Sequence, residues 1–173
     1  IEVWLSENAR CLDGIIHMGA ISTTTEKNVD KLIENNFKLS ILLWEYATKY
    51  NLKFIYASSA ATYGDGKCGF LDSEELEYLR LLKPLNPYGW SKLLFDRRVI
   101  YDAKVLDKSP AHWVGLRFFN VYGPNEWHKG EMRSVINKLY TQIKLGKEVS
   151  LFKSHRDEYG HGNQLRDFIY VKD

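Results

Sequence analysis

The sequence is short of cysteine, and it lacks both a long apolar run and an excess of charge of one sign. Cys11 and Cys68 are the two cysteines among 173 residues, and they form no C-x-x-C pair. This spacing indicates no disulfide framework, so we expect reduced thiols in a cytoplasmic protein. No apolar run approaches the roughly 18 residues of a membrane-spanning helix. We therefore expect no membrane partner.

The charge balance argues against a nucleic-acid partner. Lys and Arg total 24 against 22 Asp and Glu, which leaves a net charge of +2. A nucleic-acid-binding domain generally has a basic patch or a clear basic excess. With 45% hydrophobic and 27% charged residues, the chain has the composition of a globular protein with one sizeable core.

A possible metal cluster near the end of the sequence does not have the spacing of a metal site. His155, Asp157, Glu158 and His161 lie close together in a segment that reads as a loop. They match neither a helical H-x-x-x-H pattern nor a zinc-finger pattern. We expect no metal there.

The remaining sequence alternates between strand-like and helix-like segments. Buried strands are expected at 14–18, 52–59 and 112–123, with helices at 30–50, 88–104 and 131–145 and later strands at 148–152 and 166–171. This alternation predicts an α/β fold with a Rossmann-like, doubly wound parallel sheet. Ligands bind at the carboxyl ends of such strands. We therefore expect the segments 18–22, 58–62 and 120–123 to converge on one crevice.

The segment 64–87 reads as a loop with one short helix through "SEELEYL", capped by Asp72 or Ser73. It begins with "GDGKCG", which matches G-x-G-x-x-G literally. No long helix follows its third glycine, and no acidic residue ends a strand about 20 residues later, so we interpret it as a polar turn. The glycine-rich dinucleotide turn of the fold is missing. Because the sequence also opens without Met, we expect it to be a fragment that lacks the N-terminal glycine-rich βαβ unit and the C-terminal part of a substrate domain.

Three residues form a candidate proton-transfer set. Tyr88 and Lys92 are four apart at the start of a predicted helix and share one face. An ammonium near a phenol favours the phenolate, which makes tyrosine a usable acid or base. Ser59 ends the preceding strand, where its hydroxyl is suited to bind a substrate alcohol or carbonyl. Y-x-x-x-K alone is common, and only the combination with Ser59 on a parallel sheet is informative.

This arrangement resembles the short-chain dehydrogenases/reductases, and "YASSAATYG" and "RFFNVYGP" resemble their extended, nucleotide-sugar branch. More specific blocks cover nearly the whole chain: "HMGAISTTTE", "NN" at 35–36, "PLNPYGWSKLLFD", "VYGPNEWHKGEM", "LFKS" and "QLRDFIYVKD". Together they resemble the ADP-L-glycero-D-manno-heptose 6-epimerase family. The resemblance implies an isomerase that inverts C6″ of ADP-D-glycero-D-manno-heptose by transient oxidation and reduction, for the inner core of lipopolysaccharide. It also implies bound NADP (with NAD possible) and a homo-oligomer.

The resemblance also implies roles for individual residues. Tyr88 and Lys129 match the two acid/base residues, and Ser59 matches the active-site serine, which also contacts substrate. The implied cofactor contacts are Met18, Gly19, Ala20, Ile21, Ser22, Asn35, Lys92, Val121 and Lys129. The further implied substrate contacts are Asn120, Glu131, Lys138, Phe152, Lys153, Ser154, His155 and Arg166. Residues 1–124 would belong to the NADP-binding domain, and residues 125–173 would begin the substrate-binding region.

Several alternatives remain open at this point. Glu131, Lys138 and the segment "HRDEYGHGN" depart from the family pattern, which affects the substrate contacts. Arg166 is suited to bind a phosphate bidentately or to pair with Asp167. A dehydratase is disfavoured because Ala60 and Ala61 occupy positions where related dehydratases carry acids. Another nucleotide-sugar epimerase and a non-catalytic nucleotide-binding fragment are the remaining alternatives.

Overall fold

The computed structural model describes residues 1–154 and 157–173, and it divides into two compact units. Unit 1 comprises Ile1–Arg117, and unit 2 comprises Phe118–Asp173. A parallel strand pair is present in each unit. The predicted α/β class with parallel strands is therefore confirmed.

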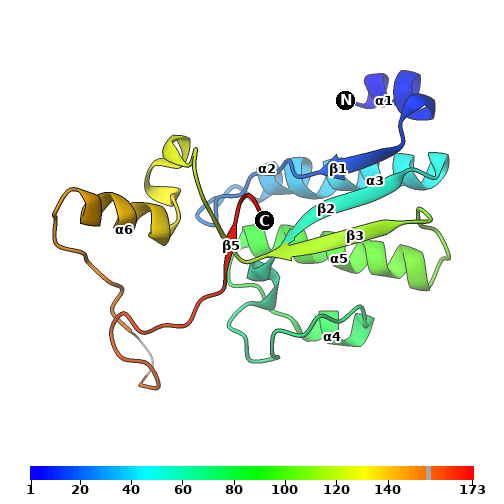
Figure 1. Ribbon diagram of the computed structural model, residues 1–173. Helices are drawn as coiled ribbons and strands as arrows, with labels where there is room; N and C mark the ends of the chain where they lie inside the picture. Colours follow the sequence, from blue (N-terminus) through cyan, green and yellow to red (C-terminus); the bar gives the residue numbers. More distant parts are fainter. Residues whose placement is uncertain (155–156) are drawn as a thin grey trace. The chain divides into compact units, whose positions relative to one another are not determined.

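Unit 1 is organised around a sheet with the order β1-β2-β3. The strands are β1 (Gly14–His17), β2 (Lys53–Ser59) and β3 (Trp113–Phe118). Strands β1 and β2 are parallel, with Gly14 opposite Lys53 and His17 opposite Tyr56. Figure 1 shows all three strands running in the same direction, so their carboxyl ends lie at one edge of the sheet.

The predicted helix at 30–50 is confirmed, although it is not α-helical throughout. It consists of α2 (Val29–Leu32), a π-helical segment η2 (Ile33–Lys38) and α3 (Leu39–Tyr50). The Asn28 side chain caps its start by accepting a hydrogen bond from the Lys31 amide, and Asn51 ends it in the left-handed conformation. Pi-helical turns are uncommon and often occur at functional sites. Here the π segment contains Asn36, which is fully buried.

The helix that carries Tyr88 is α5 (Pro87–Lys104), as predicted. Asn86 caps its first turn by accepting a hydrogen bond from the Gly89 amide, and Pro87 is the first helical residue. Helices α3 and α5 pack on the sheet around a largely aromatic and aliphatic core. The buried members of that core are Leu5, Leu43, Trp44, Ala47, Leu52, Phe54, Tyr56, Phe95 and Val99.

The segment between β2 and α5 begins with the 3-10 turn η3 (Ala60–Tyr63) and includes α4 (Leu76–Leu81). The short helix exists, but the predicted cap is wrong: Glu75 precedes it without a side-chain cap, and the Ser73 hydroxyl accepts from the Glu75 amide. "GDGKCG" is a turn, as interpreted, because Gly64, Gly66 and Gly69 all have positive φ and no helix starts there. At Gly64 a Cβ would lie 2.0 Å from the Lys83 carbonyl oxygen, so only glycine fits.

Unit 2 contains the parallel pair β4 (Asn120–Tyr122) and β5 (Phe168–Tyr170), the 3-10 segment η4 (Trp127–Met132) and α6 (Val135–Lys144). The single strand predicted at 112–123 is wrong. Strand β3 ends at Phe118 and β4 begins at Asn120 in a different sheet, and the Val121 amide bonds to the Phe119 carbonyl at this junction. The helix predicted at 131–145 begins later, where Ser134 caps α6, and Gly146 follows its end with φ +64°.

The strand predicted at 148–152 is also wrong. Its last residue, Phe152, uses its carbonyl oxygen to accept from the Gly162 amide and the Gln164 side chain, which is a loop pattern rather than a ladder. The strand predicted at 166–171 is present in shorter form as β5. None of the helices in the described part of the chain combines the length and the apolar character needed to cross a membrane.

Candidate active site

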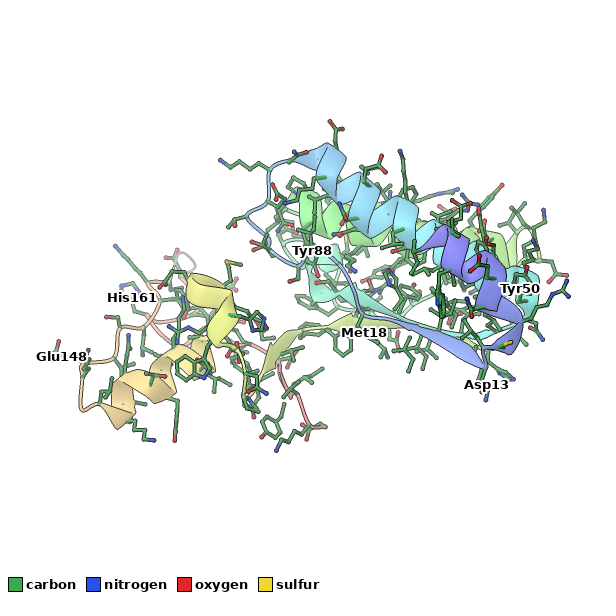
Figure 2. The ribbon with its side chains drawn as sticks, turned by 90° about the horizontal axis from the view of Figure 1, so that it is seen from above. Asp13, Met18, Tyr50, Tyr88, Glu148 and His161 are labelled. Atoms are coloured by element: carbon green, nitrogen blue, oxygen red, sulfur yellow. The ribbon has the colours of Figure 1, made fainter. Side chains whose placement is uncertain are left out.

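Ser59 and Tyr88 lie together at the carboxyl edge of the unit 1 sheet. Ser59 is the last residue of β2 and Tyr88 is in the first turn of α5. The Ser59 side chain is near enough to the Tyr88 phenol to lower its pKa. The relative exposure of each residue is 9%. Figure 2 shows Tyr88 at the same end of unit 1 as Met18, and Asp13 and Tyr50 at the opposite end. The predicted serine–tyrosine pair is therefore assembled in the fold.

A glycine explains how α5 comes so close to β2. At Gly89 a Cβ would lie 2.7 Å from the Ala61 carbonyl oxygen and 2.9 Å from the Pro84 side chain. Any larger residue would push the first turn of α5 away from η3. Because Tyr88 is the preceding residue, the same close approach keeps its ring beside Ser59.

Lys92 lies one turn after Tyr88 and is 95% buried, with a relative exposure of 5%. Its ammonium donates a 2.8 Å hydrogen bond to the Ala57 carbonyl oxygen of β2. Burial lowers the pKa of Lys92 to about 8, while the carboxylate of Asp96 acts in the opposite direction. Near neutral pH most of this lysine is therefore still charged.

The electrostatics of Tyr88 differ from the sequence-based expectation. Burial raises the pKa of the Tyr88 phenol, and the hydrogen bond from Ser59 lowers it only in part. The expected lowering by Lys92 is not found, since the phenol is desolvated and the ammonium is bonded to Ala57. In this structure Tyr88 is a protonated phenol near neutral pH, which is an acid held ready to donate.

The segment Met18–Ser22, predicted to contact a cofactor, leaves the carboxyl end of β1. Met18 is 45% exposed, and no atom lies within 4 Å of the position that a Cβ of Gly19 would take. Asn36 holds the backbone of Ile21 on both sides: its Oδ1 accepts from the amide at 2.9 Å, and its Nδ2 donates to the carbonyl at 3.0 Å. The predicted contact Asn35 is exposed, with its amide bonded to the Lys31 carbonyl.

Asn36 is also part of a buried polar chain that connects β1 with α5. His17 Nε2 lies 2.8 Å from the Ser40 hydroxyl, which donates to the Asn36 carbonyl, so the ring nitrogen must be the donor to Ser40. The Asn36 side chain donates to Ser91, and Ser91 donates to the Tyr88 carbonyl. Burial lowers the pKa of His17 to about 4, and the charge of Lys92 adds to this lowering. The histidine in this hydrogen-bonded network is therefore neutral near pH 7.

In unit 2, the predicted residues near the strand ends have separate surroundings. The Asn120 side chain donates to the Asp167 carbonyl at 2.9 Å, which ties β4 to β5, and Val121 is partly buried within β4. Lys129 is exposed on η4. Its loop is held by the buried Glu126, which accepts from the Gly123 amide and from the amide and hydroxyl of Ser134.

The remaining predicted substrate contacts lie on η4, on α6 and in the segment between α6 and β5. Lys138 forms a 3.1 Å ion pair with Glu131. Arg166 lies with its guanidinium carbon 5.4 Å from the centre of the Phe152 ring, and none of the ion pairs among the described residues joins it to Asp167. Lys153 is exposed, and the Ser154 amide donates to the His161 ring. His155 lies outside the described residues.

Sequence reasoning missed the polar residues behind the site, namely His17, Asn36, Ser40, Ser91, Asp96 and Arg117. Asp96 carried a visible signal, because it lies four residues after Lys92 and shares its helix face. The polar residues within apolar runs, such as His17 in "GIIHM", also signalled buried partners. No sequence signal indicated that Asn36, rather than Asn35, would bond to the backbone of Ile21, because this choice depends on the π-helical turn.

The fold is a parallel α/β scaffold with Ser59 and Tyr88 at the carboxyl edge of its sheet and Lys92 one turn further along α5, and the comparisons identify its family. A model of the NAD dependent epimerase/dehydratase family matches residues 4–173. The chain belongs to this family.

Particular relatives are more similar. The chain is 48% identical over its whole length to an ADP-L-glycero-D-manno-heptose-6-epimerase of Fusobacterium nucleatum, of which it covers 52%. It is 52% identical over 94% of its length to the enzyme of the same name from Nitratidesulfovibrio vulgaris, of which it covers 48%. The chain therefore spans about half the length of these curated relatives.

Solved structures show the same likeness. The ADP-L-glycero-D-manno-heptose-6-epimerase of Helicobacter pylori superimposes with a TM-score of 0.73 at 34% identity, over 98% of this chain and 49% of that one. A UDP-N-acetylglucosamine 4-epimerase from Methanobrevibacter ruminantium superimposes with a TM-score of 0.70 at 28% identity, over 92% and 48% of the two chains.

Proposed function

We propose that the full-length protein converts ADP-D-glycero-D-manno-heptose into ADP-L-glycero-D-manno-heptose by inverting C6″. The observation that carries the proposal is the buried cluster of Ser59, Tyr88 and Lys92, in a chain about half identical to proteins named for this reaction. The product would serve the inner core of lipopolysaccharide. This would make the protein an isomerase, and we propose that it works as a cytoplasmic homo-oligomer.

The first chemical role of the cluster is proton transfer at the C6″ oxygen. Ser59 and Tyr88 both present hydroxyls at the carboxyl edge of the sheet, where they would hold the substrate oxygen between them. Because burial keeps Tyr88 protonated, its phenol is suited to protonate a ketone oxygen as the alcohol is re-formed. As the phenolate, it accepts the alcohol proton in the opposite direction.

The residues of unit 1 fit a nicotinamide cofactor. The Met18–Gly19 segment is exposed with open space beside it, and Lys92 has further N–H groups beyond the one bonded to Ala57. Met18–Ser22 and Lys92 would hold the cofactor, together with Asn35, Val121 and Lys129. When bound, it supplies a hydride acceptor and donor at C6″. We propose NADP from the resemblance to the 6-epimerases, with NAD as the alternative that the family description suggests.

Inverting a carbon needs a proton partner for each face of the ketone. We propose Lys129 as the second acid/base, on the strength of its match to the family motif "NEWHKG". Asn120, Glu131, Lys138, Arg166 and the segment Phe152–His155 are proposed to bind the nucleotide-sugar. On this view residues 1–124 serve the cofactor and residues 125–173 begin the substrate-binding region.

Elimination chemistry is disfavoured by the residues beside Ser59. Ala60 and Ala61 open the η3 turn, and the Ala61 amide donates to the Ser59 hydroxyl at 3.1 Å. Neither methyl side chain is able to protonate a leaving hydroxyl, as a dehydratase requires.

The direct test is to incubate the full-length protein with ADP-D-glycero-D-manno-heptose and follow the C6″ proton by NMR. We expect an equilibrium mixture of the two 6-epimers. Binding without conversion would indicate a non-catalytic nucleotide-binding protein. Conversion of a UDP-hexose at C4, with no conversion of the heptose, would indicate a different epimerase.

A further inference from the structure

Asp96 is a buried carboxylate that has no place in the proposed chemistry, yet it is one of the most densely bonded side chains in unit 1. Its relative exposure is 3%. It accepts hydrogen bonds from the Tyr56 phenol at 3.0 Å, from the Ser58 hydroxyl at 2.8 Å and from Arg117 Nε at 3.2 Å. Burying a charge this completely is costly unless the site needs it.

The position of Asp96 relative to Lys92 is informative. The two residues are one turn apart on α5, and both reach β2. Lys92 bonds to the Ala57 carbonyl, while Asp96 bonds to the side chains of Tyr56 and Ser58. Two oppositely charged side chains of α5 therefore bond to three consecutive residues of β2, and these residues directly precede Ser59.

The neighbouring strand is shaped around this contact. A Cβ at Gly115 of β3 would lie 2.4 Å from the Tyr56 hydroxyl, so glycine leaves room for the phenol that reaches Asp96. Arg117, two residues later, bonds to Asp96 and also to the Tyr63 hydroxyl at 3.1 Å. Three elements, β2, β3 and α5, thus converge on one carboxylate.

The charges around Lys92 are few. His17 of β1 faces it and is neutral near pH 7, because burial lowers the pKa of that ring to about 4. Among the described residues, Asp96 is the acidic neighbour that favours the charged form of Lys92. Burial raises the pKa of Asp96 itself, and Arg117, Ser58 and Tyr56 act to keep it ionised. The positive charge of Arg117 is directed at Asp96 rather than at Lys92.

We propose that Asp96 is a positioning residue of this site, which docks the end of β2 onto α5 and supplies the negative charge that keeps the buried Lys92 protonated. The catalytic meaning of the proposal rests on the proposed epimerase function, whereas the effect on Lys92 does not. Arg117 and the two hydroxyls of Tyr56 and Ser58 then serve to hold this carboxylate in its ionised state.

The test is to follow the titration of the Lys92 side chain by ¹⁵N NMR in the full-length protein, with Lys92→Arg used to assign the signal. In Asp96→Asn we expect about a tenfold rise in the ratio of neutral to charged Lys92 at pH 7, because the opposite charge one turn away is gone. Asp102→Asn is the matched control. Asp102 is also buried on α5 and bonded, to Trp44 and Arg98, but it lies ten residues after Lys92. Its loss should leave the Lys92 titration unchanged.

Asp96→Asn leaves Arg117 buried without its partner, so a second variant guards against loss of the fold. Asp96→Asn/Arg117→Gln removes both charges and keeps amide hydrogen bonding. If Asp96 positions and charges Lys92, the double variant folds but its Lys92 remains more neutral than in the unmodified protein. If Asp96 is merely structural, Lys92 titrates normally in the double variant, and the proposal is overturned.

Turnover gives an independent measurement. With ADP-D-glycero-D-manno-heptose, the double variant should lose kcat at pH 7 while KM changes little, and Asp102→Asn should lose neither. A protein that shows no epimerisation at all would contradict the proposed function, yet the Lys92 titration would still decide the role of Asp96.

Discussion

The two units treat their polar residues in opposite ways. In unit 1, Ser59, Tyr88 and Lys92 are buried and bonded, and a second layer of polar side chains holds them in place. In unit 2, Lys129 is exposed, and Glu131 and Lys138 pair with each other at the surface. Each unit is thus internally consistent, but only the first has the features of a preorganised reaction site.

This difference has a physical basis. Proton-transfer groups need fixed positions and shifted pKa values, and both come from burial and neighbouring charges. Groups that bind a charged, flexible ligand are best left solvated until the ligand arrives, because exposed ion pairs contribute little and separate easily. We therefore interpret unit 1 as the part whose proton-transfer groups are preorganised, whereas Lys129, proposed above as the second acid/base, is solvated in unit 2.

The largest effect should come from the centre of unit 1. Tyr88→Phe removes one hydroxyl from the proton path, and we expect epimerisation by the full-length protein to fall by about 10²- to 10⁴-fold. Bound cofactor, measured after denaturation by mass spectrometry, should be retained. Tyr101→Phe, on the exposed side of the same helix, is the control and should keep full activity. Near-normal turnover of Tyr88→Phe would remove this tyrosine from the mechanism.

Lys129 tests whether unit 2 shares in the chemistry. Lys129→Met should nearly stop epimerisation, because one face of the ketone loses its proton partner, while hydride exchange with one 6-epimer continues through Tyr88. Each epimer is mixed separately with the variant, and reduced-cofactor absorbance and product stereochemistry are followed. Lys147→Met, an exposed lysine of the same unit, serves as control. Full activity in Lys129→Met would leave all the chemistry in unit 1.

The buried histidine of unit 1 predicts an acid-sensitive fold. His17 has a pKa of about 4 when folded against an ordinary value of 6.5, so the unfolded chain binds more protons between these values. The free energy of unfolding should therefore fall as pH drops from 6.5 to 4, by up to about 3 kcal/mol. In His17→Gln this part of the slope should disappear in urea unfolding at several pH values. Replacing the exposed His112 in the same way should leave the slope intact.

Arg166 tests the recognition role of unit 2. Arg166→Ala should raise KM for the ADP-sugar about tenfold with a smaller change in kcat, because losing a charge-assisted contact weakens substrate and transition state alike. Arg133→Ala is a matched control, since Arg133 also stacks on an aromatic ring, that of Trp127. Steady-state kinetics on both variants decide the point. If KM is the same in both, Arg166 supports the loop around Phe152 rather than the substrate.

Much of unit 1 could be predicted from the sequence because its signals are local and agree with one another. Alternating apolar segments predicted β1, β2 and α5, and the order of Ser59, Tyr88 and Lys92 placed them at one sheet edge. The division of the predicted 112–123 strand was missed, although Arg117 and Asn120 interrupt its apolar run; β3 ends at Phe118, β4 begins at Asn120, and the Val121 amide bonds to the Phe119 carbonyl at the junction. In unit 2, the expected strand at 148–152 had suitable residues but gained no pairing partner.

The electrostatics of the site were the hardest part to predict. Sequence spacing placed Lys92 one turn after Tyr88 on α5, yet it suggested a lowered phenol pKa where burial raises it. Burial depends on the whole packing of α5 against β2, including the close approach at Gly89, and no short motif reports it. The same holds for Asp96, whose partners on β2 and β3 are distant in sequence.

The most direct test of the account uses ADP-D-glycero-D-manno-heptose labelled with deuterium at C6″, incubated with the full-length protein in ordinary water. If C6″ is oxidised and reduced within one site, the same hydrogen returns to the carbon, and the L-glycero product retains the deuterium. NMR and mass spectrometry of the product measure this retention. Product that has exchanged its label for solvent hydrogen would contradict the account, because it would mean that C6″ is inverted by proton removal from carbon instead.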